Sequence, residues 1–205
     1  MMSEIYKIKD NWKKNAKVNK EEYEQMYHES IIKNDVFWSH EGKRIYWYKP
    51  YTKTKDVLYS KKEVKIKWYY DGTTNVSYNC IDRHAENTPD KTAIIWEGDD
   101  PSKVKKISYS ELKTEVCKVA NVLKKIGVKK GDRVTIYLTM IPELAYVMLA
   151  CARIGAIHSI IFGGFSSESI AGRIKDCNSE YIVTADEGVR GGKNIPLKEI
   201  ADKAL

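Results

Sequence analysis

The chain has 205 residues, 42% of them hydrophobic and 31% charged, which is the composition of an ordinary globular protein and excludes a low-complexity chain. Its formal net charge is +7, but residues 1–70 hold 16 Lys/Arg against 10 Asp/Glu, whereas residues 71–205 hold 19 against 18. Glutamates interleave with the N-terminal lysines and no motif that reads nucleic acid is present, so we expect a solvated lysine-rich surface and no nucleic-acid partner.

Residues 1–70 show no sustained alternation of strands and helices. The run EEYEQMYHESI, from Glu21, has a helical pattern, and the run RIYWYKP, from Arg44, is extended. We predict that residues 1–70 are an N-terminal extension that packs its aromatic side chains onto an α/β domain formed by residues 71–205.

From about Thr73 onward, short β-branched runs alternate with segments of helical spacing. The β-branched runs predict strands at residues 92–98, 132–138, 156–162 and 181–186. The helical spacing predicts helices at residues 108–128, 142–155, 166–177 and 197–205. Ser110 is placed to cap the first of these helices and Gly127 to end it, and Pro142 and Gly155 mark the two ends of the second.

Alternation of this kind predicts an α/β fold, in which a mostly parallel sheet carries helices on both faces. Ligands of such folds collect where the strands end at their carboxyl edge. Two glycine pairs follow predicted strands there: Gly163-Gly164 comes after the third strand, and Gly191-Gly192 lies beyond the fourth.

In the segment DEGVRGGKNIP, residues 186–196, Arg190 and Lys193 flank Gly191 and Gly192. Glycines allow backbone N–H groups to converge on an anion, and the fork of arginine matches a phosphate. A flexible surface turn often has the same composition. The residues alone leave both interpretations open.

The turn formed by Phe162, Gly163 and Gly164 has neither the G-x-G-x-x-G spacing nor the ending of a Walker motif. A tight connection between a strand and a helix explains it. The alternative is that the bare backbone of the two glycines lets a ligand ring or a pyrophosphate lie against the chain.

The four cysteines lie far apart and outside any Cys/His cluster, which argues against a zinc site and predicts reduced thiols in an intracellular compartment. The most apolar stretch, residues 141–165, is interrupted by Glu143, Arg153 and His158, so we expect no membrane partner. No targeting signal is apparent, and we expect the protein in the cytoplasm, with the nucleus as the alternative.

Four longer runs are distinctive: SYNCIDRHAENTPDKTAIIWEGDD (77–100), ISYSEL (107–112), KKGDRVTIYLTMIPELAYVMLACARIGAIHSIIFGGFSSESIAGRI (129–174) and IVTADEGVRGGKNIPLK (182–198). Together they resemble the AMP-forming acetyl-CoA synthetases of the adenylate-forming ligase superfamily. The resemblance covers residues 37–205, and the preceding residues match the N-terminal extension of that family more loosely. It implies that residues 71–205 form the first α/β subdomain of the adenylate-forming domain.

The resemblance implies a two-step ligase reaction. Acetate attacks the α-phosphate of Mg-ATP to give acetyl-adenylate and pyrophosphate, and coenzyme A then displaces AMP to form the thioester. Acetate, ATP with Mg²⁺, and coenzyme A are the small molecules implied. The remainder of the polypeptide is an implied partner, because a small C-terminal domain of the family rotates between the two half-reactions.

Two stretches of the family map onto the glycine pairs. The R-x-G-R stretch, which meets the 3′-phosphate of coenzyme A, corresponds to Arg190, Gly191, Gly192 and Lys193. The F-G-G turn, near the coenzyme A nucleotide, corresponds to Phe162, Gly163 and Gly164. Lys193 departs from the usual arginine: it keeps the positive charge and loses the bidentate fork, which implies a weaker grip on the phosphate.

The Ser/Thr/Gly-rich loop that holds the ATP phosphates in this superfamily does not occur in the 205 residues, and no position for the acetate pocket or the catalytic lysine can be assigned. We therefore expect the front portion of a ligase, with no catalytic residue, no metal ligand and no adenylation activity of its own. The alternatives are a propionyl- or other short-chain acyl-CoA synthetase, and a non-catalytic module that binds coenzyme A.

Overall fold

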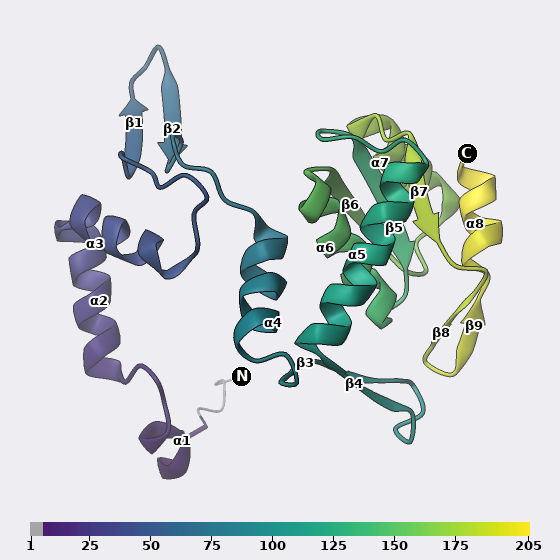
Figure 1. The fold of residues 1–205 in the computed structure, drawn as a ribbon, viewed down its shortest axis with the longest axis horizontal. Coiled ribbons are helices and arrows are strands. Elements are labelled where there is room, and N and C mark those ends of the chain that lie inside the picture. Colours follow the sequence, from purple (N-terminus) through teal and green to yellow (C-terminus); the bar gives the residue numbers. More distant parts are fainter. Residues whose placement is uncertain (1–5) are drawn as a thin grey trace, which may run out of the picture. The chain divides into compact units, whose positions relative to one another are not determined.

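The computed structural model describes residues 6–205 of the chain (Figure 1). It consists of two compact units, the first ending at Thr74 and the second extending from Asn75 to Leu205. Within the described residues, no helix has both the length and the apolar character needed to cross a lipid bilayer.

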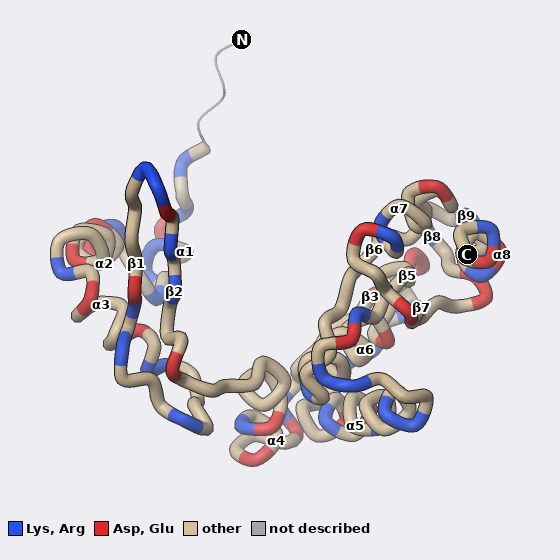
Figure 2. Tube along the Cα trace, turned by 90° about the horizontal axis from the view of Figure 1, so that it is seen from above, with Lys and Arg blue, Asp and Glu red and all other residues tan. Residues whose placement is uncertain are grey.

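The first unit contains helices α1 (Asp10–Lys14), α2 (Lys20–Ile32) and α3 (Asn34–Glu41), a 3-10 turn η1 (Gly42–Arg44), and an antiparallel hairpin of β1 (Lys55–Tyr59) and β2 (Val64–Trp68). The helix predicted from Glu21 is confirmed as α2, which begins with a capping box between Asn19 and Glu22. The run RIYWYKP forms no strand and contributes one bridge, between Lys49 and Thr73. Cationic residues lie on both strands of the unpredicted β1–β2 hairpin (Figure 2).

Aromatic side chains of the first unit pack against one another. The ring centroids of Trp38 and Trp68 are 5.9 Å apart, those of Trp47 and Tyr51 are 5.0 Å apart, and those of Tyr51 and Tyr69 are 4.7 Å apart. The first two pairs are edge-to-face and the third is tilted, and such contacts between rings stabilise the first unit.

The second unit is built around a parallel sheet in the order β6–β5–β7. Its strands are β5 (Arg133–Leu138), β6 (Ile157–Phe162) and β7 (Tyr181–Thr184). In register, Tyr137 pairs with Ile161 on one side and with Thr184 on the other. The three predicted strands and their parallel pairing are confirmed, and all three strands end at the same edge.

Helices cover both faces of this sheet, as predicted (Figure 1). They are α5 (Tyr109–Lys125), α6 (Pro142–Ile154), α7 (Ser167–Cys177) and α8 (Leu197–Ala204). Alternation along β5 separates the two layers: Val134 and Ile136 join the core formed with α5 and α6, whereas Tyr137 packs with residues of α7 and α8. Pro142 begins α6, and Gly155, with φ 78°, ends it, as predicted.

The strand predicted at residues 92–98 is present as β3 (Thr92–Glu97), but it lies outside the parallel sheet. It pairs antiparallel with β4 (Val104–Ser108), a strand that the sequence analysis missed. Ser110 does not cap α5, because Ser108 does: its hydroxyl accepts the N–H of Glu111, and the Glu111 carboxylate accepts the N–H of Ser108. This capping box satisfies two backbone donors at once. Gly127, with φ 103°, follows the end of α5 as expected.

A buried ion pair joins the segment before β3 to helix α6. The π-helical turn η2 (Tyr78–Asp82) leads into α4 (Arg83–Asn87). Asp82 accepts hydrogen bonds of 2.7 and 2.6 Å from the guanidinium of Arg153, and the Nζ of Lys113 lies 3.3 Å from the same carboxylate. Burial raises the pKa of Asp82, but the hydrogen bonds and charges of Arg153 and Lys113 outweigh it and lower the pKa below its usual value.

Replacing Asp82 with Asn should destabilise the chain, because Arg153 and Lys113 lose their counter-charge. Removal of one partner of a buried ion pair costs on the order of 3–5 kcal/mol of stability. Because the Arg153 side chain is 24% exposed, we expect the unfolding free energy to fall by about 2–3 kcal/mol. The pKa of Asp82 is lower in the folded state than in the unfolded chain. Its contribution to the free energy of unfolding is therefore complete above the unfolded-state pKa of about 3.9, and it is lost as the pH falls through the folded-state pKa.

Urea unfolding of the two proteins at about pH 7 and about pH 3 measures both effects, and the difference in unfolding free energy should shrink at the lower pH. Asp202→Asn is the matched control, since Asp202 pairs with Lys198 on the exposed surface of α8 and should matter little. Equal stability of Asp82→Asn and the unsubstituted chain at pH 7 would contradict the role given to this ion pair.

Candidate functional site

Two connections meet at the carboxyl edge of the parallel sheet. β6 ends at Phe162 and continues into Gly163 and Gly164, and the chain beyond β7 forms two short strands, β8 (Gly188–Arg190) and β9 (Lys193–Ile195). A Cβ placed on Gly164 would lie 3.3 Å from Nη1 of Arg190. The structure therefore brings together the two segments that the strand order had placed at this edge.

The segment around Gly191 is a two-residue β-hairpin. β8 and β9 pair antiparallel with Arg190 opposite Lys193, so that Gly191 and Gly192 form the turn. Their φ angles are 57° and 71°, and positive φ at both central residues is what a type I′ turn requires. A Cβ at either position would meet nothing within 4 Å. The turn conformation itself therefore explains both glycines.

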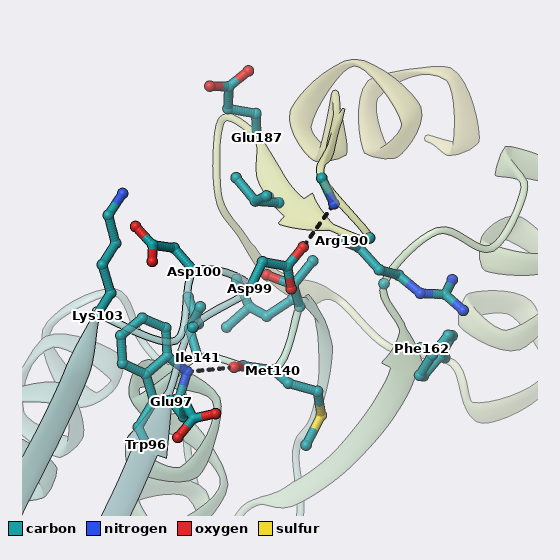
Figure 3. Close-up of a pocket in the computed structure, with 18 residues that line it drawn as sticks. Trp96, Glu97, Asp99, Asp100, Lys103, Met140, Ile141, Phe162, Glu187 and Arg190 are labelled. Carbon is teal, nitrogen blue, oxygen red and sulfur yellow. Dashed lines mark hydrogen bonds between the residues drawn. The ribbon is translucent and has the colours of Figure 1, made fainter.

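Arg190 points from this hairpin toward Phe162 (Figure 3). Its Cζ lies 4.6 Å from the centroid of the Phe162 ring, a cation–π distance. Within residues 6–205, neither Arg190 nor Lys193 forms an ion pair with a carboxylate. Both side chains are exposed, and they flank the turn directly opposite each other. Their positive charges are therefore open to a ligand.

The turn after β6 is held by Tyr137, a residue that the sequence analysis did not single out. The Tyr137 ring is fully buried in β5. Its hydroxyl accepts the N–H of Gly164 at 3.1 Å and donates to the carbonyl of Phe165 at 3.0 Å. Gly164 has φ 106°, and a Cβ on Gly163 would come within 3.0 Å of the Leu138 carbonyl oxygen. Both glycines are thus required by the path of the backbone.

A cavity of about 950 Å³ opens at this edge, between the β3–β4 hairpin, the ends of β5 and β6, and the β8–β9 hairpin (Figure 3). Five of the predicted site residues line it: Phe162, Gly163, Arg190, Gly191 and Gly192. Gly164 and Lys193 lie outside its wall. The indole N–H of Trp96 donates to the carbonyl of Met140 at 2.7 Å, which fixes β3 to the chain after β5.

Carboxylates outnumber cations on the cavity wall. The negatively charged residues that line it are Glu97, Asp99, Asp100 and Glu187, and the positively charged ones are Lys103 and Arg190. At the hairpin tip the N–H of Gly192 donates to Oδ2 of Asp99 at 2.9 Å. One backbone donor of the predicted anion-binding turn is therefore bonded to a carboxylate of the chain itself.

Metal-ligating and thiol side chains elsewhere in the described residues form no further candidate site. In the part of the chain that the structure describes, no three His, Cys, Asp or Glu side chains gather in a way that could hold a metal ion. The four cysteines are free, as predicted. Burial raises the pKa of the Cys151 thiol to about 11, which keeps it protonated at neutral pH. The arrangement at the sheet edge is suited to binding an anionic group beside a flat apolar one.

Comparison with known proteins assigns both parts of the chain. A family model described as AMP-binding enzyme matches residues 81–204, and one described as acetyl-coenzyme A synthetase N-terminus matches residues 23–80.

Three curated relatives, each named acetyl-coenzyme A synthetase, match the whole chain. Identity is 60% over 206 residues for the protein of Mesorhizobium japonicum, 60% over 205 residues for that of Parvibaculum lavamentivorans, and 58% over 205 residues for that of Rhizobium rhizogenes. Each match covers 100% of this chain but only 32%, 32% and 31% of the respective relative. The chain thus spans about a third of the length of these relatives.

Replacing Tyr137 with Phe should loosen the turn after β6, because the N–H of Gly164 and the carbonyl of Phe165 both lose their partner. Leaving a buried hydrogen-bonding group without a partner costs about 1–3 kcal/mol. Because Gly164 is itself exposed, we expect the unfolding free energy, measured with urea, to fall by about 1–2 kcal/mol. Tyr146→Phe is the control: Tyr146 is 4% exposed, and its hydroxyl has no hydrogen bond to the described residues. A loss of stability as large in Tyr146→Phe as in Tyr137→Phe would contradict this role for Tyr137.

Proposed function

Since this chain belongs to the AMP-binding enzyme family, we propose that it forms the N-terminal third of an acetate–CoA ligase. In the first step, an acetate oxygen bonds to the α-phosphorus of ATP and pyrophosphate leaves. In the second step, the sulfur of coenzyme A bonds to the acyl carbon, AMP leaves and the thiol proton is released. The names of the relatives that match the whole chain support acetate as the acyl substrate.

One observation carries the site assignment: Arg190 lies beside the Phe162 ring, at the wall of a cavity, without a carboxylate partner among the described residues. We assign Arg190, Gly191, Gly192 and Lys193 to the 3′-phosphate of coenzyme A. The adjoining turn, formed by Phe162, Gly163 and Gly164, is assigned to the nucleotide that carries this phosphate.

These side chains fit the nucleotide end of coenzyme A. A guanidinium binds a phosphate through two parallel N–H bonds, and a lysine adds charge without that fork. The Phe162 ring is 48% exposed, which leaves apolar surface for a purine next to the guanidinium. The bare backbone of the turn removes side-chain bulk from the same wall.

The role of this chain in the reaction is to bind and orient. Arg190 and Lys193 neutralise the phosphate, and the contact with the ring fixes the direction in which the rest of the ligand leaves the site. Bound coenzyme A supplies the thiol that accepts the acyl group. ATP, its Mg²⁺ and the acetate pocket are assigned to the longer polypeptide, and we assign no residue of this chain to the adenylation step.

In the full-length protein, Arg190→Ala should raise the KM for coenzyme A and leave the first half-reaction intact. A hydrogen bond to a charged group contributes about 1.5–3 kcal/mol, so the KM should rise about ten- to a hundredfold. Acetate-dependent exchange of pyrophosphate into ATP, measured without coenzyme A, should proceed at the unsubstituted rate because it does not use this site.

Arg173→Ala is the matched control, because the Arg173 guanidinium lies 5.6 Å from the Phe165 ring in the same kind of contact but outside the cavity wall. Its KM for coenzyme A should not change. Loss of pyrophosphate exchange in Arg190→Ala, or an unchanged KM, would contradict the site assignment. Exchange that prefers propionate to acetate would identify a different short-chain ligase, and its absence with every carboxylate would leave a coenzyme A-binding module.

A further inference from the structure

Asp99 connects two hairpins that are far apart in the sequence. It lies in the turn between β3 and β4, and its Oδ2 accepts the N–H of Gly192 at the tip of the β8–β9 hairpin, 93 positions away (Figure 3). Within the described residues no cation pairs with the Asp99 carboxylate. An exposed negative charge is therefore held at the turn by one backbone hydrogen bond.

A phosphate at this turn would meet that negative charge. Arg190 immediately precedes the turn, and the N–H of Gly192 belongs to the same two-residue connection. A phosphate that contacts both Arg190 and this N–H must take the acceptor position of Asp99. A phosphate that contacts Arg190 alone still lies at the wall of the cavity that the uncompensated Asp99 carboxylate also lines, and like charges at one site repel each other.

We propose that Asp99 competes with the 3′-phosphate of coenzyme A for the backbone donor of Gly192, and so lowers the affinity of the site for that phosphate. The inference rests on the proposed function, because it requires a phosphorylated ligand at Arg190. A purely structural role for Asp99 predicts the opposite change in affinity. If Asp99 only held the β8–β9 hairpin in its binding conformation, its removal would weaken the binding of coenzyme A.

Asp99→Asn separates charge from hydrogen bonding, because the asparagine oxygen still accepts the N–H of Gly192 while the negative charge is gone. In the full-length protein, isothermal titration calorimetry should show coenzyme A binding about fivefold more tightly, a change of about 1 kcal/mol. For 3′-dephospho-coenzyme A, which lacks the competing phosphate, the dissociation constant should change less than about twofold. The KM for coenzyme A should fall in parallel.

Two further variants complete the test. Asp99→Ala removes both the charge and the hydrogen bond, and it should tighten coenzyme A binding at least as much as Asp99→Asn. Asp100→Asn is the matched control: Asp100 lines the same cavity, but its carboxylate accepts from the N–H and hydroxyl of Ser102 within its own turn. Its effect on coenzyme A should stay below about twofold, because charges farther from the phosphate are screened by salt.

The outcomes distinguish this inference from the function on which it rests. If Arg190→Ala weakens coenzyme A binding but Asp99→Asn leaves it unchanged or weaker, only the competition by Asp99 is wrong. Equal gains for coenzyme A and for its dephospho form would also overturn it, because the 3′-phosphate would then play no part. If Arg190→Ala changes the dissociation constant of neither ligand, the assignment of the coenzyme A site is wrong, and the competition by Asp99 is wrong as well.

Discussion

Parallel pairing of β5 with both β6 and β7 brings the two glycine-containing segments of the site to one edge of the sheet. Because the three strands run in the same direction and in register, the turn after Phe162 and the hairpin that carries Arg190 emerge at one edge. Side chains that alternate along β5 pack on the two helix layers in turn. The Tyr137 ring packs with α7 and α8, and its hydroxyl accepts the N–H of Gly164 in the turn after β6. One buried strand therefore supports both the core and the geometry of this sheet edge.

The two cationic side chains at this edge have no counter-charge bound to them among the described residues. Arg190 and Lys193 are exposed and have no carboxylate partner among the described residues, so a phosphate would not have to break an ion pair in order to bind. The cavity wall beside them is rich in carboxylates, and Asp99 reaches the hairpin tip itself. In the proposed coenzyme A site, attraction by two cations would therefore act against repulsion by nearby carboxylates.

Local signals in the sequence predicted much of the second unit. Short β-branched runs gave the three parallel strands, and Pro142 and Gly155 marked the ends of α6, because these features act through neighbouring residues. The β1–β2 and β8–β9 hairpins were missed, although VKIKW alternates and Gly191-Gly192 is a type I′ turn sequence, since five- and three-residue strands give weak periodicity. The roles proposed for the two glycine pairs come from the family resemblance. The contact of Arg190 with Phe162, the support by Tyr137 and the approach of Asp99 depend on distances across strands, which no spacing along the chain reveals.

A crystal structure of the full-length protein with coenzyme A bound tests the central claim most directly. The account predicts that oxygens of the 3′-phosphate lie about 3 Å from the guanidinium nitrogens of Arg190 and that the N–H of Gly192 no longer bonds to Asp99. It is contradicted if the ribose phosphate is bound elsewhere, with the β8–β9 hairpin free of ligand.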